Sequence, residues 1–184
     1  MSNRIAQIII LAEDQEHQML VRRYLIHTGH ERRSFRFLPL PANRRCGSQF
    51  VRERFAEQVK ECRGMLARGA SNLLIVITDA DNLKTTEREQ NLQAELAKLG
   101  NDAVDTNEPI VILIPKWNVE TWVKCLLGQS MDEENRDSDR PPVTREQITT
   151  AAAILFAWAR HNAQPGGTCV ASLNAALPRW RKIG

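Results

Sequence analysis

Two short apolar runs in this chain each end in acidic residues. Residues 8–12 (IIILA) are followed by Glu13, and residues 73–78 (LLIVIT) are followed by Asp79 and then Asp81. Runs this short and this rich in β-branched residues are typical of strands buried on both faces of a parallel sheet. Ligands of open α/β sheets bind at the carboxyl ends of such strands. If the two strands are neighbours, Glu13, Asp79 and Asp81 meet at one edge of the sheet.

Carboxylates gathered at one edge indicate a particular chemistry. They repel one another unless a cation lies between them, and hard oxygen ligands of this kind suit Mg²⁺ or Mn²⁺. The pattern therefore predicts an acidic divalent-metal site. Glu16, which follows Glu13 by about one helical turn, is either a further ligand or an ordinary exposed acid on a helix.

Composition limits the class of protein. The chain has 184 residues, of which 42% are apolar, enough for one domain with a real core. No apolar run approaches the roughly 20 residues that cross a bilayer, no signal-peptide pattern opens the chain, and the four cysteines form no CxxC pair. We therefore expect a cytoplasmic protein with reduced thiols and no membrane partner.

The net charge of +3 is too small to indicate a nucleic-acid partner by itself. Arginine is nonetheless clustered, at residues 22–23, 32–33, 44–45 and 179–181. Such clusters either bind phosphates or form an ordinary solvated surface.

The order of apolar patterns predicts the fold class. Strands are expected at residues 4–12, 34–40, 72–78 and 109–114, and helices at residues 14–28, 49–68 and 83–99, with Ser48 capping the second helix. Strands that alternate with helices favour an α/β protein with an open, mostly parallel sheet flanked by helices.

The remainder of the chain is expected to be helical around a charged loop. A helix should follow Asn118, residues 131–142 are charged and poor in apolar side chains and predict a mobile loop, and a capping box from Thr144 to Gln147 opens a helix over 144–163. A last amphipathic helix is expected over 169–183. The predicted organisation is an α/β domain at 1–128, a charged loop at 129–143, and a helical extension at 144–184 that packs on the same domain.

A family resemblance adds to this interpretation. Glu13, in the segment LAEDQE at residues 11–16, and the Asp79-Ala80-Asp81 motif resemble the Toprim domain of topoisomerases and primases. The resemblance spans roughly residues 4–127 and is nearest to small single-domain Toprim proteins and the nuclease half of the OLD family. Two glycines usual in the family are missing: Asp14 follows the glutamate, and residues 82–84 (NLK) follow the acidic motif. Their absence puts the family's mode of substrate access in doubt.

The resemblance implies metal-assisted phosphoryl transfer. One or two Mg²⁺ or Mn²⁺ ions would be held by Glu13, Asp79 and Asp81, with Glu13 as general base or acid. OLD-like systems supply a separate ABC-type ATPase, often in defence against phage, and this chain has no P-loop. The resemblance therefore implies a nuclease component that acts on DNA or RNA with such a partner.

Other residues near the predicted edge have two interpretations each. Lys116 ends the third buried run, so it either contacts a phosphate or is simply solvated. Glu120, in the segment NVETW at 118–122, resembles a Glu-x-Trp segment of small Toprim-like proteins and would complete the metal site, whereas Trp122 is expected in the core. The histidines at 17, 27, 30 and 161 share no ligand spacing and are expected to be ordinary helix-surface or loop residues, although His17 is close enough to Glu13 in the sequence to be watched as a site residue.

Two alternatives from other functional classes remain open. A receiver-like signalling domain also has an acid pair after its first strand, a phospho-accepting Asp after its third and a Lys after its fifth, which Glu13-Asp14, Asp79 and Lys116 imitate. Only four strands are clear here, and labelling by acetyl phosphate would discriminate. The third interpretation is a catalytically inactive assembly subunit, in which Trp158 and Trp180 either face a partner or fill the protein's own core.

Overall fold

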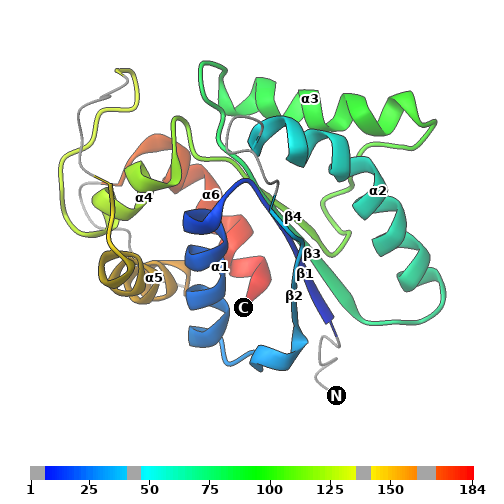
Figure 1. Cartoon of the computed structure of the whole chain (residues 1–184), viewed down its shortest axis with the longest axis horizontal. Helices are drawn as coiled ribbons and strands as arrows, with labels where there is room; N and C mark the ends of the chain where they lie inside the picture. Colours follow the sequence, from blue (N-terminus) through cyan, green and yellow to red (C-terminus); the bar gives the residue numbers. More distant parts are fainter. Residues whose placement is uncertain (1–6, 41–46, 136–141, 161–168) are drawn as a thin grey trace.

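A four-stranded sheet forms the centre of the molecule. The computed structural model describes residues 7–40, 47–135, 142–160 and 169–184. The strands β1 (Gln7–Ala12), β2 (Phe35–Phe37), β3 (Asn72–Ile77) and β4 (Ile110–Leu113) are all parallel and lie in the order β2-β1-β3-β4 (Figure 1). This confirms the predicted α/β class with a parallel sheet.

The two central strands are buried on both faces, as their continuous apolar sequences predict. β1 and β3 run in register from the pair Ile8 and Leu73 to the pair Ala12 and Ile77. Alternate side chains enter separate cores, so that Ile8 and Ile10 lie in one and Ile9 and Leu11 in the other. The sheet therefore needs a helical layer on each side.

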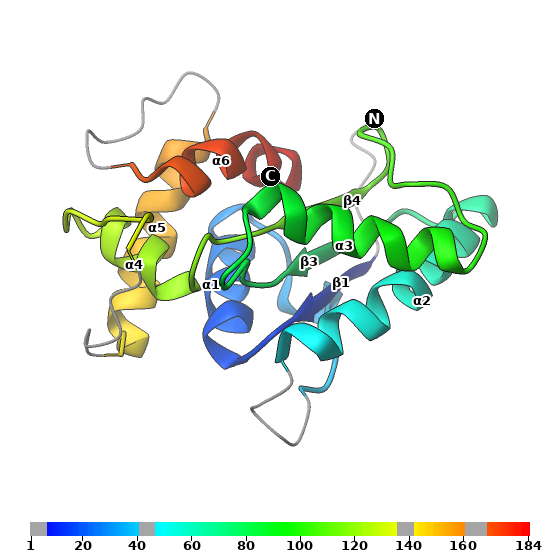
Figure 2. The same cartoon turned by 90° about the horizontal axis from the view of Figure 1, so that it is seen from above.

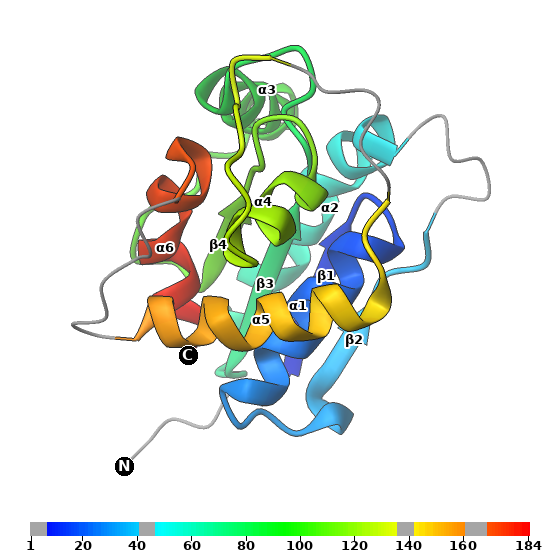
Figure 3. The same ribbon diagram turned by 90° about the vertical axis from the view of Figure 1, so that its left-hand side faces the viewer.

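Six α-helices in the described part of the chain supply those two layers. One face is covered by α1 (Gln15–His27), α4 (Val119–Leu126), α5 (Arg145–Ala159) and α6 (Ala171–Ile183), and the other by α2 (Gly47–Ala67) and α3 (Thr85–Lys98) (Figures 1 and 2). Figure 3 shows α5 lying across α1. The C-terminal helices thus belong to the layer that α1 begins.

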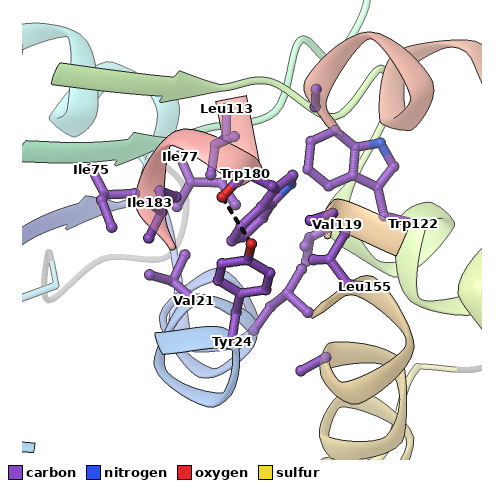
Figure 4. Close-up of a cluster of buried hydrophobic side chains, with 14 of the residues drawn as sticks. Val21, Tyr24, Ile75, Ile77, Leu113, Val119, Trp122, Leu155, Trp180 and Ile183 are labelled. Atoms are coloured by element: carbon purple, nitrogen blue, oxygen red, sulfur yellow. Dashed lines mark hydrogen bonds between the residues drawn. The ribbon is translucent and has the colours of Figure 1, made fainter. Parts of the chain in front are cut away.

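A cluster of aromatic rings joins α6 to that layer (Figure 4). The ring of Trp180 lies 4.6 Å from the ring of Tyr24 and 6.5 Å from that of Trp122, measured between centroids. The Tyr24 hydroxyl donates a 2.8 Å hydrogen bond to the carbonyl oxygen of Trp180. Trp122 and Trp180 are both fully buried, so the expected core position of Trp122 is confirmed and Trp180 fills the protein's own core.

Several predicted boundaries differ from the observed ones. A short 3₁₀ helix at Arg32–Ser34 precedes β2, which ends at Phe37 rather than at residue 40; Pro39, which follows it, has no N–H for a sheet ladder. Ser48 is not a cap, because α2 already begins at Gly47. The capping box at Thr144 is present, but α5 ends at Ala159. The predicted ends at residues 4–6 and 161–163 lie outside the described residues.

The described part of the predicted charged loop is attached to the helical layer through Glu133. Glu133 accepts a 2.9 Å hydrogen bond from the backbone N–H of Ser172 at the start of α6, and its carbonyl oxygen accepts one of 2.9 Å from Trp117 Nε1. The Glu133 carboxylate also accepts from the Ser172 hydroxyl. Residues 136–141 of the predicted mobile loop lie outside the described part.

Candidate metal centre

The sheet has a topological switch point between its two central strands. β1 pairs with β2 on one side and with β3 on the other, and the helices that follow β1 and β2 cover opposite faces. Open α/β sheets bind ligands outside the carboxyl ends of the strands at this position. Glu13 follows β1 directly and Asp79 follows β3 by two residues, so the fold brings these two acids together.

Glu13 is held in place by the chain that follows β3. Its Oε2 accepts hydrogen bonds from the Thr78 hydroxyl at 2.8 Å and from the backbone N–H of Asp79 at 3.0 Å. The first residue of α2, Gly47, packs against the same side chain so closely that a Cβ there would lie 2.5 Å from Glu13 Cγ. The partly positive start of α2 therefore approaches the Glu13 carboxylate.

His17 is the site residue that sequence reasoning noted only for its nearness to Glu13. The prediction that it is an ordinary helix-surface or loop residue is wrong, because it is fully buried. Its Nδ1 lies 2.6 Å from Asp14 Oδ1 and its Nε2 lies 2.9 Å from Asp79 Oδ1. A signal was present: position 17 precedes the buried positions 20, 21, 24 and 25 of α1 at helical spacing, so it continues the face that packs on the sheet.

Asp14 has two roles at the start of α1. It is the N-cap residue, and its Oδ1 accepts a 3.0 Å hydrogen bond from the backbone N–H of His17. The same oxygen contacts the ring Nδ1 of His17. A carboxylate that receives the proton of one ring nitrogen orients the other nitrogen, which is how metal-ligating histidines are usually supported.

Glu13, His17 and Asp79 form a group that can hold a metal ion. One potential ligand atom from each side chain lies within 4.8 Å of the other two. The donor set is two carboxylate oxygens and one imidazole nitrogen. Carboxylates suit Mg²⁺ and Mn²⁺, whereas imidazole favours transition metals, so this set fits Mn²⁺ better than Mg²⁺.

The protonation of the group reflects its burial. Loss of water raises the pKa of Asp79 to about 7, although the neighbouring His17 opposes this. Burial disfavours the charged imidazole of His17, yet the carboxylates of Asp79 and Asp14 outweigh that effect and raise the pKa of His17 well above its usual value. Both pKa values are raised, so the His17 and Asp79 pair retains a proton at neutral pH.

Asp81 lies outside this group. Its backbone adopts a left-handed conformation with φ of 54°, and its Oδ2 accepts a 2.9 Å ion-pair hydrogen bond from Arg88 Nη2. The structure thus brings together two of the three predicted carboxylates, Glu13 and Asp79, and directs the third to an arginine of α3.

The remaining predicted residues do not join the group. The Lys116 ammonium donates a 2.8 Å hydrogen bond to the carbonyl oxygen of Leu83 and lies 4.5 Å from the centre of the Trp117 ring. Glu120 lies in the first turn of α4, where burial raises its pKa and the negative charge of Asp14 adds to that effect. Neither Glu120 nor Glu16 supplies a ligand atom to the group that can hold an ion.

Comparison with known proteins finds no matching family model, no matching curated protein and no matching solved structure. Among the residues that the structure describes, no helix is long and apolar enough to cross a membrane.

Proposed function

We propose that this chain is a divalent-metal-dependent phosphoryl-transfer protein that hydrolyses phosphodiester bonds of nucleic acid. The observation that carries the proposal is the buried Glu13, His17 and Asp79 group at the switch point of a parallel sheet. The Toprim resemblance of Glu13 and of Asp79, the first acid of the Asp79-Ala80-Asp81 motif, supports the same chemistry.

Each side chain has a defined part in the proposed site. Glu13, His17 and Asp79 would hold Mn²⁺ or Mg²⁺, and Asp14 orients the His17 ring. Such an ion, when bound, activates water and stabilises the charge of a scissile phosphate. Thr78 and the Asp79 amide hold one oxygen of Glu13, which leaves the other oxygen for a ligand or for a proton. Lys116 adds positive charge at the edge that a phosphate would approach.

The test compares the wild type with a site variant and a matched control. Purified protein is incubated with single- and double-stranded DNA and RNA in Mn²⁺, in Mg²⁺ and in EDTA. We expect cleavage in Mn²⁺, weaker cleavage in Mg²⁺, none in EDTA, and none by Asp79→Asn. Asp102→Asn makes the same chemical change on the loop before β4 and should cleave like the wild type. Wild-type cleavage that persists in EDTA, or an Asp79→Asn protein that is fully active, would contradict the proposal.

A partner and a cellular setting form part of the same proposal. The family resemblance favours a separately encoded ABC-type ATPase and a cytoplasmic, prokaryotic defence system. A net charge of +3 is weak for independent binding to nucleic acid, so the isolated protein should cleave slowly. Co-purification of the tagged protein from its native host should recover the ATPase. Recovery of the protein alone, together with efficient cleavage by the isolated protein, would contradict this part.

A receiver-like signalling function is the second candidate. The strand order β2-β1-β3-β4 agrees with it, because flavodoxin-like folds share that order and their switch point between β1 and β3, and Asp79 follows β3. The burial of Asp79 against His17 opposes it, since a phosphoryl donor must reach that carboxylate. Incubation with acetyl phosphate should therefore leave Asp79 unlabelled. Labelling at Asp79, with no cleavage in either metal, would establish the signalling function instead, and failure of both assays would leave an inactive assembly subunit.

A further inference from the structure

The turn after Asp79 contains the one unusual backbone conformation among the described residues. Asp81 has φ of 54°, and every other described residue with positive φ is a glycine. A side chain with a Cβ disfavours this left-handed conformation, although Asp tolerates it better than most residues. Contacts around the turn must therefore hold Asp81 in place.

Arg88, in the first turns of α3, supplies those contacts. Its Nη2 donates to Asp81 Oδ2 at 2.9 Å and to the carbonyl oxygen of Ala80 at 3.3 Å. The Arg88 side chain is only 11% exposed, so its charge is largely removed from water and depends on these two acceptors. The guanidinium therefore binds the turn through both its backbone and its side chain.

The same turn is fixed from the neighbouring strand as well. The Ala80 N–H donates to the carbonyl oxygen of Pro115 at 2.8 Å, the Leu83 N–H donates to that of Ala80 at 3.0 Å, and Lys116 Nζ donates to that of Leu83 at 2.8 Å. Residues 80–83 are consequently attached both to α3 and to the segment that follows β4. Asp79 immediately precedes this turn.

Asp79, which immediately precedes the turn, makes two contacts in the metal group. Its N–H must reach Glu13 Oε2 and its carboxylate must reach His17 Nε2, at 3.0 Å and 2.9 Å. We propose that Arg88 and Asp81 are positioning residues that hold Asp79 in the metal site, and that Asp81 is not itself a metal ligand. This inference rests on the proposed function only for the identity of the ion.

Binding of Mn²⁺ alone, measured by calorimetry, provides the first test. Loss of a residue that supports a metal ligand typically weakens metal binding about 10–100-fold, so Asp81→Asn and Arg88→Leu should each weaken Mn²⁺ binding by about tenfold. Because both variants remove one interaction, the double variant should be no weaker than either single variant. Additive losses would show that Asp81 acts independently of Arg88, as a ligand would, and would overturn the proposal.

The absorption spectrum of bound Co²⁺ distinguishes a ligand from a positioning residue. The spectrum of Asp81→Asn should match that of the wild type at saturating Co²⁺, whereas His17→Gln should change it. Asp102→Asn is the matched control. A changed Co²⁺ spectrum in Asp81→Asn would identify Asp81 as a ligand and overturn the inference.

Hydrogen exchange without metal separates failure of this inference from failure of the proposed function. In Asp81→Asn and Arg88→Leu the Asp79 amide should exchange faster, because its bond to Glu13 loosens, while the amides of Ile9 and Ile75 in the central strands stay protected and show that the fold is retained. Faster exchange without any Mn²⁺ binding by the wild type would uphold the positioning pair and reject the metal site. Unchanged exchange at Asp79 would reject the positioning pair whatever the metal does.

Discussion

His17 defines the character of the site because both of its ring nitrogens contact carboxylates. Its Nδ1 contacts the Asp14 carboxylate, and this contact orients the ring so that Nε2 faces Asp79. A buried imidazole between two acids is either a protonated bridge or a metal ligand supported by one of the acids, and the two states exclude each other at Nε2. The behaviour of the molecule towards metals and towards pH is therefore coupled at this one residue.

Removal of His17 should separate metal binding from folding. We expect His17→Gln to weaken Mn²⁺ binding by more than about 100-fold, and Asp14→Asn, which removes only the negative charge beside His17, to weaken it by about tenfold. Calorimetry measures both, and circular dichroism shows whether the fold is retained. His27→Gln alters an exposed histidine of the same helix and should bind like the wild type. A His17→Gln protein with unchanged affinity would remove His17 from the ligand set.

Metal binding should strengthen as pH rises. The pKa of His17 is raised well above its usual value by Asp79 and Asp14 against the effect of burial, so Mn²⁺ must displace a proton. Affinity should rise about tenfold per pH unit until the pH passes the pKa of His17. Calorimetry in buffers of different ionisation enthalpy should detect about one released proton per bound ion. Binding that does not depend on pH would show that Nε2 is not a ligand.

The metal-free protein should show the opposite trend in stability. His17 has a folded-state pKa above its unfolded value, so its contribution is complete below about pH 6.5 and is lost as pH rises through the folded pKa. Burial gives Asp79 a folded pKa of about 7, so its ionisation also costs stability as pH rises towards that value. The Tm without metal should fall as pH rises towards about 7, where Asp79 ionises, and should continue to fall as pH rises through the folded pKa of His17. Mn²⁺ should restore the Tm. In His17→Gln, the control, the part of the fall that is due to His17 should be absent, whereas the part due to Asp79 should remain.

At the scale of elements, the approach of α2 to the site depends on one glycine. A Cβ on Gly47 would lie 2.5 Å from Glu13 Cγ, so Gly47→Ala must displace either the start of α2 or Glu13. We expect a loss of about 1–3 kcal/mol in the free energy of unfolding, together with weaker Mn²⁺ binding. Denaturant unfolding and calorimetry measure the two effects.

Gly64→Ala is the control within the same helix. The atom nearest to a Cβ at that position is Arg68 Nη1, at an ordinary 3.6 Å. Replacement of a mid-helix glycine should stabilise the protein by about 0.5–1 kcal/mol without any effect on metal binding. Equal effects of the two substitutions would show that the contact with Glu13 has no special consequence.

The elements themselves were largely predictable, whereas the site was predictable only in part. The sequence predicts β1 and β3 because a strand buried on both faces needs apolar side chains at consecutive positions, and both segments have such unbroken apolar runs. Glu13 and Asp79 follow from the rule that strand ends meet at one edge. The position of the Asp81 side chain could not be predicted in this way. Its spacing of two residues after Asp79 does not reveal the left-handed turn that directs the side chain towards Arg88 on α3. That contact joins residues whose proximity only the folded turn creates.

At the scale of the whole molecule, α6 closes the core that α1 begins. Trp180 packs against Tyr24 of α1 and Trp122 of α4, and the core cluster on this face contains residues of β1, β3, β4 and all four covering helices (Figure 4). Because side chains from all these elements pack in one core, a change in the packing of one element alters the folding free energy of the others. The metal group lies at the start of α1, so we expect its geometry to depend on the packing of the C-terminal helices.

This coupling predicts one cooperative unfolding transition. Trp180→Ala should lose about 3–5 kcal/mol of unfolding free energy because it leaves a large cavity, and the midpoints from tryptophan fluorescence and from circular dichroism should shift together. Trp180→Phe should cost much less, since the indole Nε1 is buried without a hydrogen-bond partner and its removal breaks no hydrogen bond. Two outcomes would contradict this prediction: two separate transitions, or a Trp180→Ala protein whose Mn²⁺ affinity and unfolding midpoint match the wild type. Either would mean that the metal site does not require the packing of α5 and α6. The expected result is a single shifted transition in which Mn²⁺ binding is lost in proportion to the unfolded fraction. That result would mean that the metal site exists only while the entire helical layer is folded.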